Sequence, residues 1–376
     1  MMLAAIIDAH VKVWQETGTG ALEAFLATLR MRRDEIEALC RLPDDIAASM
    51  KDLGLYRALA PRALGGDERS PADFLRLVES LSAADGSVGW VASFAGAVVY
   101  LAGLPPHRFE QFYADGPDVA FAAGLFPVQP VRRQGDKLIL SGRWKFASGC
   151  SGADWLGAGI VIDDEGQSAK PRVIIFPRAQ AQLIADWKVL GLAGTGSYDL
   201  VLTDVAIEAD WSFVRGGGTT RTEPIYHFPV IPFSALNHAI VGVGCALGAL
   251  NEAGAAPASE RSAASLAAAT ARLLAARALI YRQTEHVWAH VQSGQPVPAR
   301  DQGLLRMAAK SAAEAAIAAC HAALAATDPD DAAARKNVSR HLRDALVVGQ
   351  HAFLSPAVYE QAGQLLLGGP APPGFI

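Results

Sequence analysis

The sequence has few cysteines and little net charge, and both shortages exclude classes of protein. Its 376 residues include only four cysteines, Cys40, Cys150, Cys245 and Cys320. They lie far apart and form no C-x-x-C pair, so neither a zinc site nor a disulfide framework is indicated, and the pattern fits a reducing compartment. The formal net charge of -5 at pH 7 offers no basic footprint for a nucleic acid.

The chain also lacks the sequence features of export and of membrane insertion. Residues 1–14, MMLAAIIDAHVKVW, contain no basic segment, and Asp8 and His10 interrupt their apolar run, so no signal peptide is predicted. No apolar stretch reaches the roughly 18–20 residues that span a bilayer. We therefore expect a soluble cytoplasmic protein with no membrane partner.

The chain does contain three zones of different periodicity. Residues 1–117 carry helical patterns, at 42–56, 71–85 and 86–106. Residues 118–225 carry short β-type runs separated by turn residues, and strands without helices between them predict an antiparallel sandwich or barrel. Residues 226–376 are rich in alanine and helical in pattern, with candidate helices at 266–291, 302–326 and 331–353. Their lengths and short connections predict an antiparallel helical bundle.

Two stretches carry a family resemblance that fits this order of zones. LPDDIAASMKDLGLYRALAPRALGG (42–66) and WKVLGLAGTGSYDLVLTDVAI (187–207) resemble the opening helix and the β-domain signature of the acyl-CoA dehydrogenase superfamily. The resemblance runs along nearly the whole chain. It implies an α+β fold with an N-terminal helical domain, a central antiparallel β-domain and a C-terminal four-helix bundle.

Within that superfamily the chain is most similar to the flavin-dependent monooxygenases, the oxygenase components of two-component systems. The similarity lies in GSVGWVASFAG (86–96), GRWKFASGCSGADWLGAGIVI (142–162) and RHLRDALVVGQHAFLSPAVYEQAGQLLLGG (340–369). True dehydrogenases carry a Thr-Glu-Pro flavin loop where this chain has GLFPVQPVRRQGD (124–136). The resemblance implies hydroxylation of a small aromatic or heteroaromatic substrate through a flavin C4a-hydroperoxide. It also implies molecular oxygen, FMNH2 or FADH2 from a separate reductase, and a homotetramer or homodimer.

The stretch GRWKFASGC suggests how such a flavin would be held. Alternation predicts that Trp144, Phe146 and Ser148 share one face of a strand, as flavin-facing residues or as ordinary inward-facing ones. A flavin needs a flat apolar wall and hydrogen bonds near its reactive edge. The resemblance implies that the two aromatic residues form this wall and that Ser148 stabilises the peroxide.

Further residues enter through the same resemblance. Gly194, Thr195 and Ser197 of the GTGS turn are implied near the cofactor, although no helix follows the turn to make a phosphate cradle. The helical pattern predicts Arg340, Asp344, Val347 and His351 on one face, and the resemblance makes His351 the catalytic histidine, which positions or deprotonates the substrate. It also implies that Trp90, Tyr100 and Arg343 line the substrate side.

Several departures keep other functions open. Glu360 in VYEQAG would be the base of an acyl-CoA dehydrogenase-like oxidoreductase, but the Gly-Thr expected after it is Gln361-Ala362. The second histidine of several such monooxygenases is missing near Val98, where Tyr100 would substitute. The segment 251–263 looks shorter than the family loop that contacts the flavin phosphate. A non-catalytic relative that has lost flavin therefore remains a third alternative.

No metal site is predicted. His286 and His290 have the i, i+4 spacing of a metal-binding pair, but no third ligand is visible in the sequence.

Overall fold

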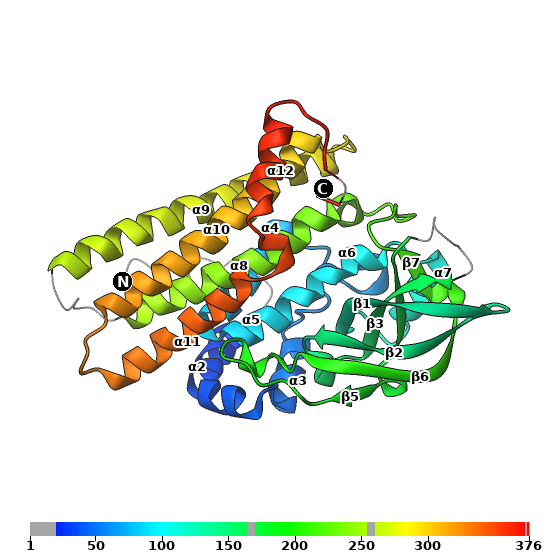
Figure 1. Cartoon of the computed structure of the whole chain (residues 1–376), viewed down its shortest axis with the longest axis horizontal. Coiled ribbons are helices and arrows are strands. Elements are labelled where there is room, and N and C mark those ends of the chain that lie inside the picture. The colour runs from blue at the N-terminus through cyan, green and yellow to red at the C-terminus, as the bar shows by residue number, and fades with distance from the viewer. Residues whose placement is uncertain (1–19, 164–169, 254–259, 373, 376) are drawn as a thin grey trace.

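The computed structural model describes residues 20–163, 170–253, 260–372 and 374–375. The segment 1–14 and residues 254–259 of the segment 251–263 lie outside these described residues, so the predictions on them stay untested. The described chain has helices, then strands, then helices, as the sequence predicts (Figure 1). The exact domain boundaries at 117 and 225 stay predictions.

The N-terminal helices begin where side chains satisfy their free backbone N–H groups. Ser70 caps α4 by accepting from the Asp73 N–H at 3.1 Å, and Pro71 occupies the first position. Asp85 caps α5 through the Val88 N–H at 3.0 Å. The N-terminal helices are α2 (Ala21–Leu39), α3 (Asp44–Asp52), α4 (Pro71–Ala84), α5 (Gly86–Ser93), α6 (Val98–Leu101) and α7 (Pro106–Phe112).

The stretch 86–106 was predicted as one apolar helix, and the structure divides it. A 3-10 turn, η2 (Phe94–Ala97), separates α5 from α6. Gly96 sits in this turn against Asn237, where a Cβ atom would lie 2.2 Å from the amide nitrogen. The residues at both junctions, Ser93 and Val98, keep right-handed helical backbone angles, and both helices lie between the C-terminal bundle and the sheet (Figure 1).

The β-domain is one seven-stranded sheet of order β5-β6-β2-β1-β3-β4-β7. Its strands are β1 (Phe121–Gln134), β2 (Lys137–Ala147), β3 (Trp155–Ile162), β4 (Arg172–Pro177), β5 (Gln182–Ile184), β6 (Tyr198–Glu208) and β7 (Ser212–Val214). The prediction of an antiparallel sheet holds for every pair except β1 and β3, which run parallel. The reason is topological: β2 folds back on one side of β1, and β3 then returns along the other side.

The C-terminal helices are α8 (Val230–Glu252), α9 (Glu260–Gln292), α10 (Ala299–Ala326), α11 (Ala332–Gly349) and α12 (Ala357–Leu366). Helices α8 to α11 form the predicted bundle, and α8 runs through the middle of the molecule (Figure 1). The statement that no apolar stretch is long enough to span a bilayer was wrong. By length and composition two helices qualify, namely Val230–Glu252 and Ser262–Gln292.

These two helices differ in burial. The apolar window of Val230–Glu252 is 89% buried, so its hydrophobicity is that of a core helix. The window of Ser262–Gln292 is only 22% buried, and α9 lies along the outer edge of the bundle (Figure 1). Exposed alanines on α9 include Ala264, Ala268, Ala271, Ala275 and Ala278. This helix therefore presents an apolar stripe that nothing in the described chain covers.

Candidate functional site

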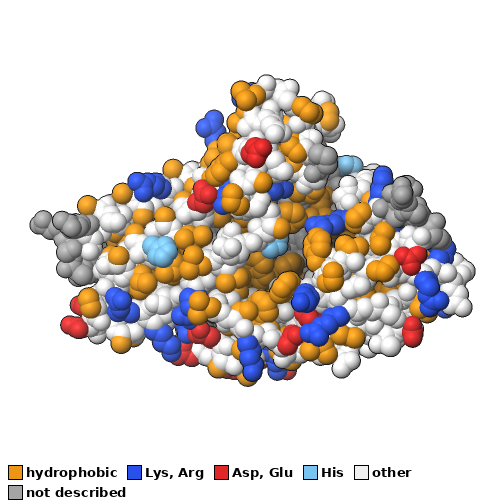
Figure 2. Space-filling model, in the orientation of Figure 1, with side chains coloured by type: hydrophobic (Ala, Val, Ile, Leu, Met, Phe, Trp, Pro, Cys, Tyr) orange, Lys and Arg blue, Asp and Glu red, His pale blue; other side chains and the backbone are white. Residues whose placement is uncertain are grey.

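A cluster of aromatic and histidine rings lies where α5, α8 and the segment after α11 meet. The Trp90 ring stacks on His238 with centroids 4.7 Å apart and meets His351 edge-on at 5.8 Å. The two histidine rings are 4.0 Å apart. Phe353 stacks on His238 at 5.9 Å and lies 5.2 Å from His351. Figure 2 shows the surface hollowed between the bundle and the sheet, with hydrophobic side chains lining the depression and a histidine in it.

A chain of hydroxyl groups joins this cluster to the β-domain. Trp90 Nε1 donates to Ser148 Oγ at 3.0 Å, Ser148 Oγ lies 2.7 Å from Ser197 Oγ, and Ser197 Oγ lies 2.7 Å from Thr195 Oγ1. Thr195 donates its one proton to the Leu192 carbonyl at 2.8 Å. Each hydroxyl has only one proton, so Ser197 must donate to Thr195, and Ser148 to Ser197. Ser148 is therefore left with one lone pair that can accept a further hydrogen bond.

The electrostatics of the cluster keep both histidines neutral. Burial, followed by the charges of Arg215 and Arg306, lowers the pKa of His351 to about 4. Burial, followed by the neighbouring His351, lowers the pKa of His238 well below its usual value. His351 Nδ1 accepts from the Phe353 N–H at 3.3 Å. The proton of the neutral His351 ring therefore sits on Nε2, and that nitrogen is a donor in this arrangement.

His351 does not lie on the helix where the sequence placed it. Helix α11 ends at Gly349, and His351 is the extended N-cap of a 3-10 turn, η9 (Ala352–Leu354). The predicted shared face was therefore wrong. Arg340 and Asp344 are buried on α11 and face α2 and the GTGS turn, whereas His351 turns toward Trp90. The helical spacing in the sequence continues past Gly349, but the helix itself ends at that residue.

The predicted wall of Trp144 and Phe146 is not formed as a single face. The Trp144 side chain is 0% exposed, and its Nε1 donates to the Gly159 carbonyl at 2.7 Å inside the sheet. Phe146 is 62% exposed and meets Trp187 edge-on at 6.1 Å. The β2–β6 register shifts between Trp144 and Ala147, and Phe146 has a positive φ of 62°. This bulge reverses the alternation, so the placement predicted for Trp144 was wrong.

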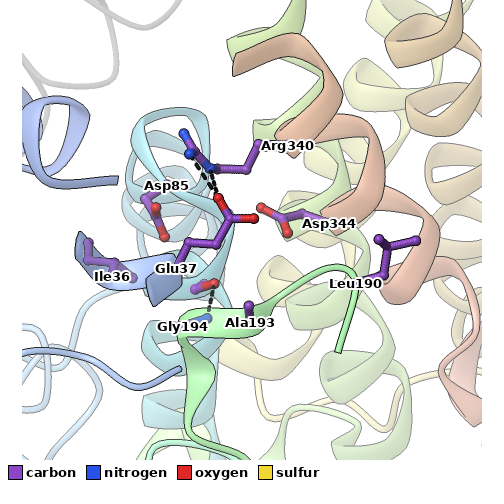
Figure 3. A pocket seen from close by; sticks show the side chains of 9 residues that line it. Ile36, Glu37, Asp85, Leu190, Ala193, Gly194, Arg340 and Asp344 are labelled. Carbon is purple, nitrogen blue, oxygen red and sulfur yellow. Dashed lines mark hydrogen bonds and ion pairs between the residues drawn. The ribbon is translucent and has the colours of Figure 1, made fainter. Parts of the chain in front are cut away.

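The turn that contains Gly194 is held from behind rather than open to a phosphate. The Gly194 N–H donates to Ser87 Oγ at 3.1 Å, and a Cβ atom at this position would lie 2.2 Å from Ile36. Figure 3 shows the small cavity behind the turn, where Arg340 pairs with Glu37. Gly194 is thus required for close packing. Of the three predicted GTGS residues, Thr195 and Ser197 reach the hydroxyl chain and Gly194 does not.

Asp344 faces this cavity and holds the turn in place. Its Oδ1 accepts from the Leu192 N–H at 2.6 Å. Leu192 has a positive φ of 54°, a backbone conformation that is unfavourable for any residue other than glycine. Burial, followed by the nearby carboxylate of Asp85, raises the pKa of Asp344 to about 7. The same Leu192 residue supplies the carbonyl at the end of the hydroxyl chain, so Asp344 supports that chain indirectly.

The remaining predicted residues, Tyr100, Arg343 and Glu360, lie in three different places. Tyr100 belongs near the cluster, because its hydroxyl lies 2.9 Å from Ser234 Oγ, one helical turn before His238 on α8. Arg343 is on the other side of α11, where it donates to the Leu190 carbonyl at 2.8 Å and pairs with Glu37. Glu360 is exposed in the first turn of α12.

The sequence reading missed His238. The second histidine was sought after the GW of α5, but the structure supplies it from α8, on the opposite side of Trp90. Its Nδ1 is buried and has no hydrogen-bond partner among the described residues. The available signal was the pair Asn237-His238, which interrupts an otherwise apolar helix in ALNHAIVGVG (235–244). A buried polar group without a partner is rare and indicates a site.

The structure places a third residue, Asp301, beside His286 and His290, which the sequence did not reveal. Asp301, in the first turn of α10, lies with its Oδ2 3.5 Å from His286 Nε2, and the ligand atoms of the three residues all fall within 4.8 Å of one another. His286 and Asp301 can also form an ion pair at the surface when His286 is protonated. The prediction that the chain has no metal site stays a prediction.

Comparisons with known proteins agree with this fold. Residues 236–356 match the family model described as acyl-CoA dehydrogenase, C-terminal domain. The chain is 37% identical over 371 residues to an indole-3-acetate monooxygenase of Pseudomonas putida, covering 95% of each chain. It is 34% identical to the protein of the same name from Acinetobacter baumannii, covering 94% of this chain and 95% of that one.

A solved structure extends the likeness to three dimensions. The 3-HSA hydroxylase from Rhodococcus sp. RHA1 superposes with a TM-score of 0.88 at 25% identity, covering 95% of this chain and 98% of that chain. The predicted fold class is confirmed. The chain belongs to the acyl-CoA dehydrogenase superfamily, in its branch of flavin-dependent monooxygenases.

Proposed function

We propose that this protein is the oxygenase component of a two-component system and hydroxylates a small aromatic or heteroaromatic compound with reduced flavin and molecular oxygen. One observation carries the proposal. The Trp90–His238–His351 ring cluster and the Ser148 hydroxyl meet through a single hydrogen bond, 3.0 Å long, from Trp90 to Ser148. A group of largely buried aromatic and histidine rings thus adjoins a polar group on the β-domain side. The name shared by two relatives makes indole-3-acetate the first substrate to test.

The residues present fit a flavin on the β-domain side. Phe146 presents an exposed ring from a strained, positive-φ position, and strain of that kind is retained where function requires it. Ser148, two residues further along the chain, keeps one free acceptor position. Phe146 and Ser148 would therefore hold the flavin ring, while Trp144 supports the strand from within. When bound, reduced flavin activates oxygen for transfer to the substrate.

The chain's own groups would do the rest. Trp90 and Phe353 pack against a planar substrate, and the buried rings around them keep water away from the reacting atoms. His351 donates from Nε2 to a heteroatom of the substrate and so fixes its orientation. His238 contributes an unpartnered ring nitrogen that can accept a proton from the substrate.

The deciding experiment mixes the protein with photoreduced FMN or FAD, adds oxygenated buffer and indole-3-acetate, and measures the hydroxylated product and hydrogen peroxide. We expect product in near-stoichiometric yield with one of the two flavins. Ser148→Ala is expected to shift the yield toward hydrogen peroxide. If neither flavin gives product from any aromatic probe and neither binds the protein, the non-catalytic alternative stands in place of this proposal.

The acyl-CoA dehydrogenase alternative has less support. Its base would be Glu360, and this side chain is exposed on α12 rather than directed into the ring cluster. Reduction of bound oxidised flavin by an acyl-CoA, with loss of that activity in Glu360→Gln, would reverse this preference.

We further propose that the protein is cytoplasmic, receives its flavin from a separate reductase and assembles as a homodimer or homotetramer through α9. The support is the apolar stripe of α9, which is long enough for a membrane span yet only 22% buried in one chain. A second copy of the chain would cover it. Alanine faces allow helices to approach closely.

Ala275→Glu is expected to reduce the assembly to a smaller species, because it places a charge in the middle of the stripe. Light scattering coupled to size exclusion measures the mass, and circular dichroism checks that the helices remain. Ala333→Glu, at an exposed alanine of α11, is the matched control and should leave the mass unchanged. A monomeric wild-type protein, or an unchanged mass for Ala275→Glu, would contradict the α9 interface.

A further inference from the structure

Arg306 stands apart from the other buried cations of the chain. It lies on α10 and is 4% exposed. Each of the other cations that are buried among the described residues has a carboxylate partner: Arg33 pairs with Glu252 at 2.7 Å, Lys310 with Glu314 at 3.0 Å and Arg340 with Glu37 at 2.8 Å. Among the described residues Arg306 has no such partner. A buried charge without a counter-charge is unfavourable, so this guanidinium is prepared for an anion that the described chain does not supply.

The hydrogen bonds of Arg306 leave part of the guanidinium free. Nη1 donates to the Phe375 carbonyl at 2.9 Å and Nη2 to the Phe353 carbonyl at 3.2 Å. Nε is buried and has no partner in the part of the chain that the structure describes. The guanidinium also lies over the Phe353 ring at 5.6 Å. It is thus fixed in place, directly beside the residue that packs on both histidines.

A second unpaired cation approaches the same region. Arg215 follows β7, is half-buried and lies over the Phe126 ring at 5.4 Å. It makes no ion pair with any described residue. Its charge acts on the hydroxyl of Tyr100, which lies 2.9 Å from Ser234 Oγ. Arg215 and Arg306 both act on Tyr100 and on His351, so their fields overlap at the ring cluster.

We propose that Arg306 and Arg215 form a carboxylate-binding subsite, so that the substrate is an aromatic acid rather than a neutral aromatic compound. The inference rests on the proposed function, since it places the substrate ring against the packed rings of Trp90, His238 and Phe353. The acid group then extends toward Arg306, whose free Nε offers a charge-assisted hydrogen bond. When Ser234 donates to Tyr100, the Tyr100 hydroxyl keeps its own proton and supplies a neutral donor.

Binding of a carboxylate at this subsite would also change the pKa of His351. The two arginines help to hold the pKa of His351 down. A bound carboxylate offsets their charge and raises the pKa of His351 from about 4 back toward neutrality. Binding of the correct substrate would thus make His351 more basic, and a neutral analogue would not.

The experiment measures binding to the flavin-free protein by calorimetry, with indole-3-acetate and its uncharged isostere indole-3-acetamide as probes. We expect the acid to bind at least about tenfold more tightly than the amide. Arg306→Met keeps the length and apolar stem of the side chain but removes its charge. It should lower the affinity for the acid to that for the amide, and leave the affinity for the amide unchanged.

Arg215→Gln is the second variant, because its half-buried position makes loss of folding less of a concern. It should reduce the preference for the acid part-way. Equal binding of acid and amide by the wild-type protein overturns the subsite, as does an equal loss of both affinities in Arg306→Met or a failure of both probes to bind. Oxygenation of indole and of the amide as efficiently as of the acid would leave the proposed function standing and overturn the subsite alone.

Discussion

His351→Ala is expected to lower the rate of product formation by about 10²–10⁴-fold, the usual scale for a positioned acid–base group. Reduced flavin and oxygen should still be consumed, with hydrogen peroxide appearing instead of product. The reason is position: the His351 ring lies 4.0 Å from His238 and meets Trp90 edge-on, so it touches the substrate space and not the hydroxyl chain. Single-turnover mixing with quantification of product and peroxide makes the measurement.

The matched control separates chemistry from structure. His351 caps η9 through its Nδ1, which accepts from the Phe353 N–H. Asparagine is also a good cap but has no imidazole. His351→Asn should therefore retain the folded turn and still lose product. His321→Ala, at an exposed histidine of α10, should behave as the wild-type protein. Recovery of product formation in His351→Asn would reduce His351 to a structural residue.

The pH dependence follows from the lowered pKa of His351. A histidine with a folded-state pKa of about 4 remains neutral down to that pH, whereas the unfolded chain binds the proton near pH 6.5. Folding stability is therefore lost as the pH falls from about 6.5 toward 4. As the pH is lowered, hydroxylation of a carboxylate substrate should already decline above pH 4, because the bound acid raises the pKa of His351.

The sequence was sufficient for the parts of the fold that depend on local pattern. The candidate helices at 302–326 and 331–353 match α10 and α11 within a few residues at each end, because helical spacing is a local property. The sequence offered no range for α2 or α8. Ser148, Ser197, Thr195, Trp90 and His351 also lie close together. Their roles at the cofactor and the substrate stay predictions.

The failures arise where one residue changes the backbone or where a partner is distant in the chain. A positive φ at Phe146 separates it from Trp144, and alternation alone cannot reveal a bulge. His238 lies in a helix that is apolar apart from Asn237 and His238, and its contact with Trp90 joins residues far apart in the chain. Arg306 looks like any arginine on an alanine-rich helix, and its importance depends on the missing partner, which only the packed structure can show.

The second large effect concerns Asp344, whose carboxyl holds the Leu192 N–H at 2.6 Å. Its pKa is raised from 3.8 to about 7 in the folded protein. At pH values between these two, the chain therefore takes up a proton at Asp344 when it folds. The contribution of Asp344 to stability is then full below about pH 4 and is lost as the pH rises through about 7. The stability of the wild-type protein relative to Asp344→Asn should fall by about 4 kcal/mol across this range.

Denaturant unfolding of both proteins between pH 4 and pH 8 makes the measurement, and the difference cancels the opposing contributions of the buried histidines. Asp52→Asn, at an exposed position of α3, is the control and should show no such trend. Asp344→Ala should cost about 2–4 kcal/mol near pH 4, because it leaves the buried Leu192 N–H without an acceptor, and this cost should shrink as the pH rises through about 7. Since the Leu192 carbonyl ends the hydroxyl chain, this variant should also raise peroxide release. A difference between wild type and Asp344→Asn that does not change with pH would show that Asp344 is ionised throughout.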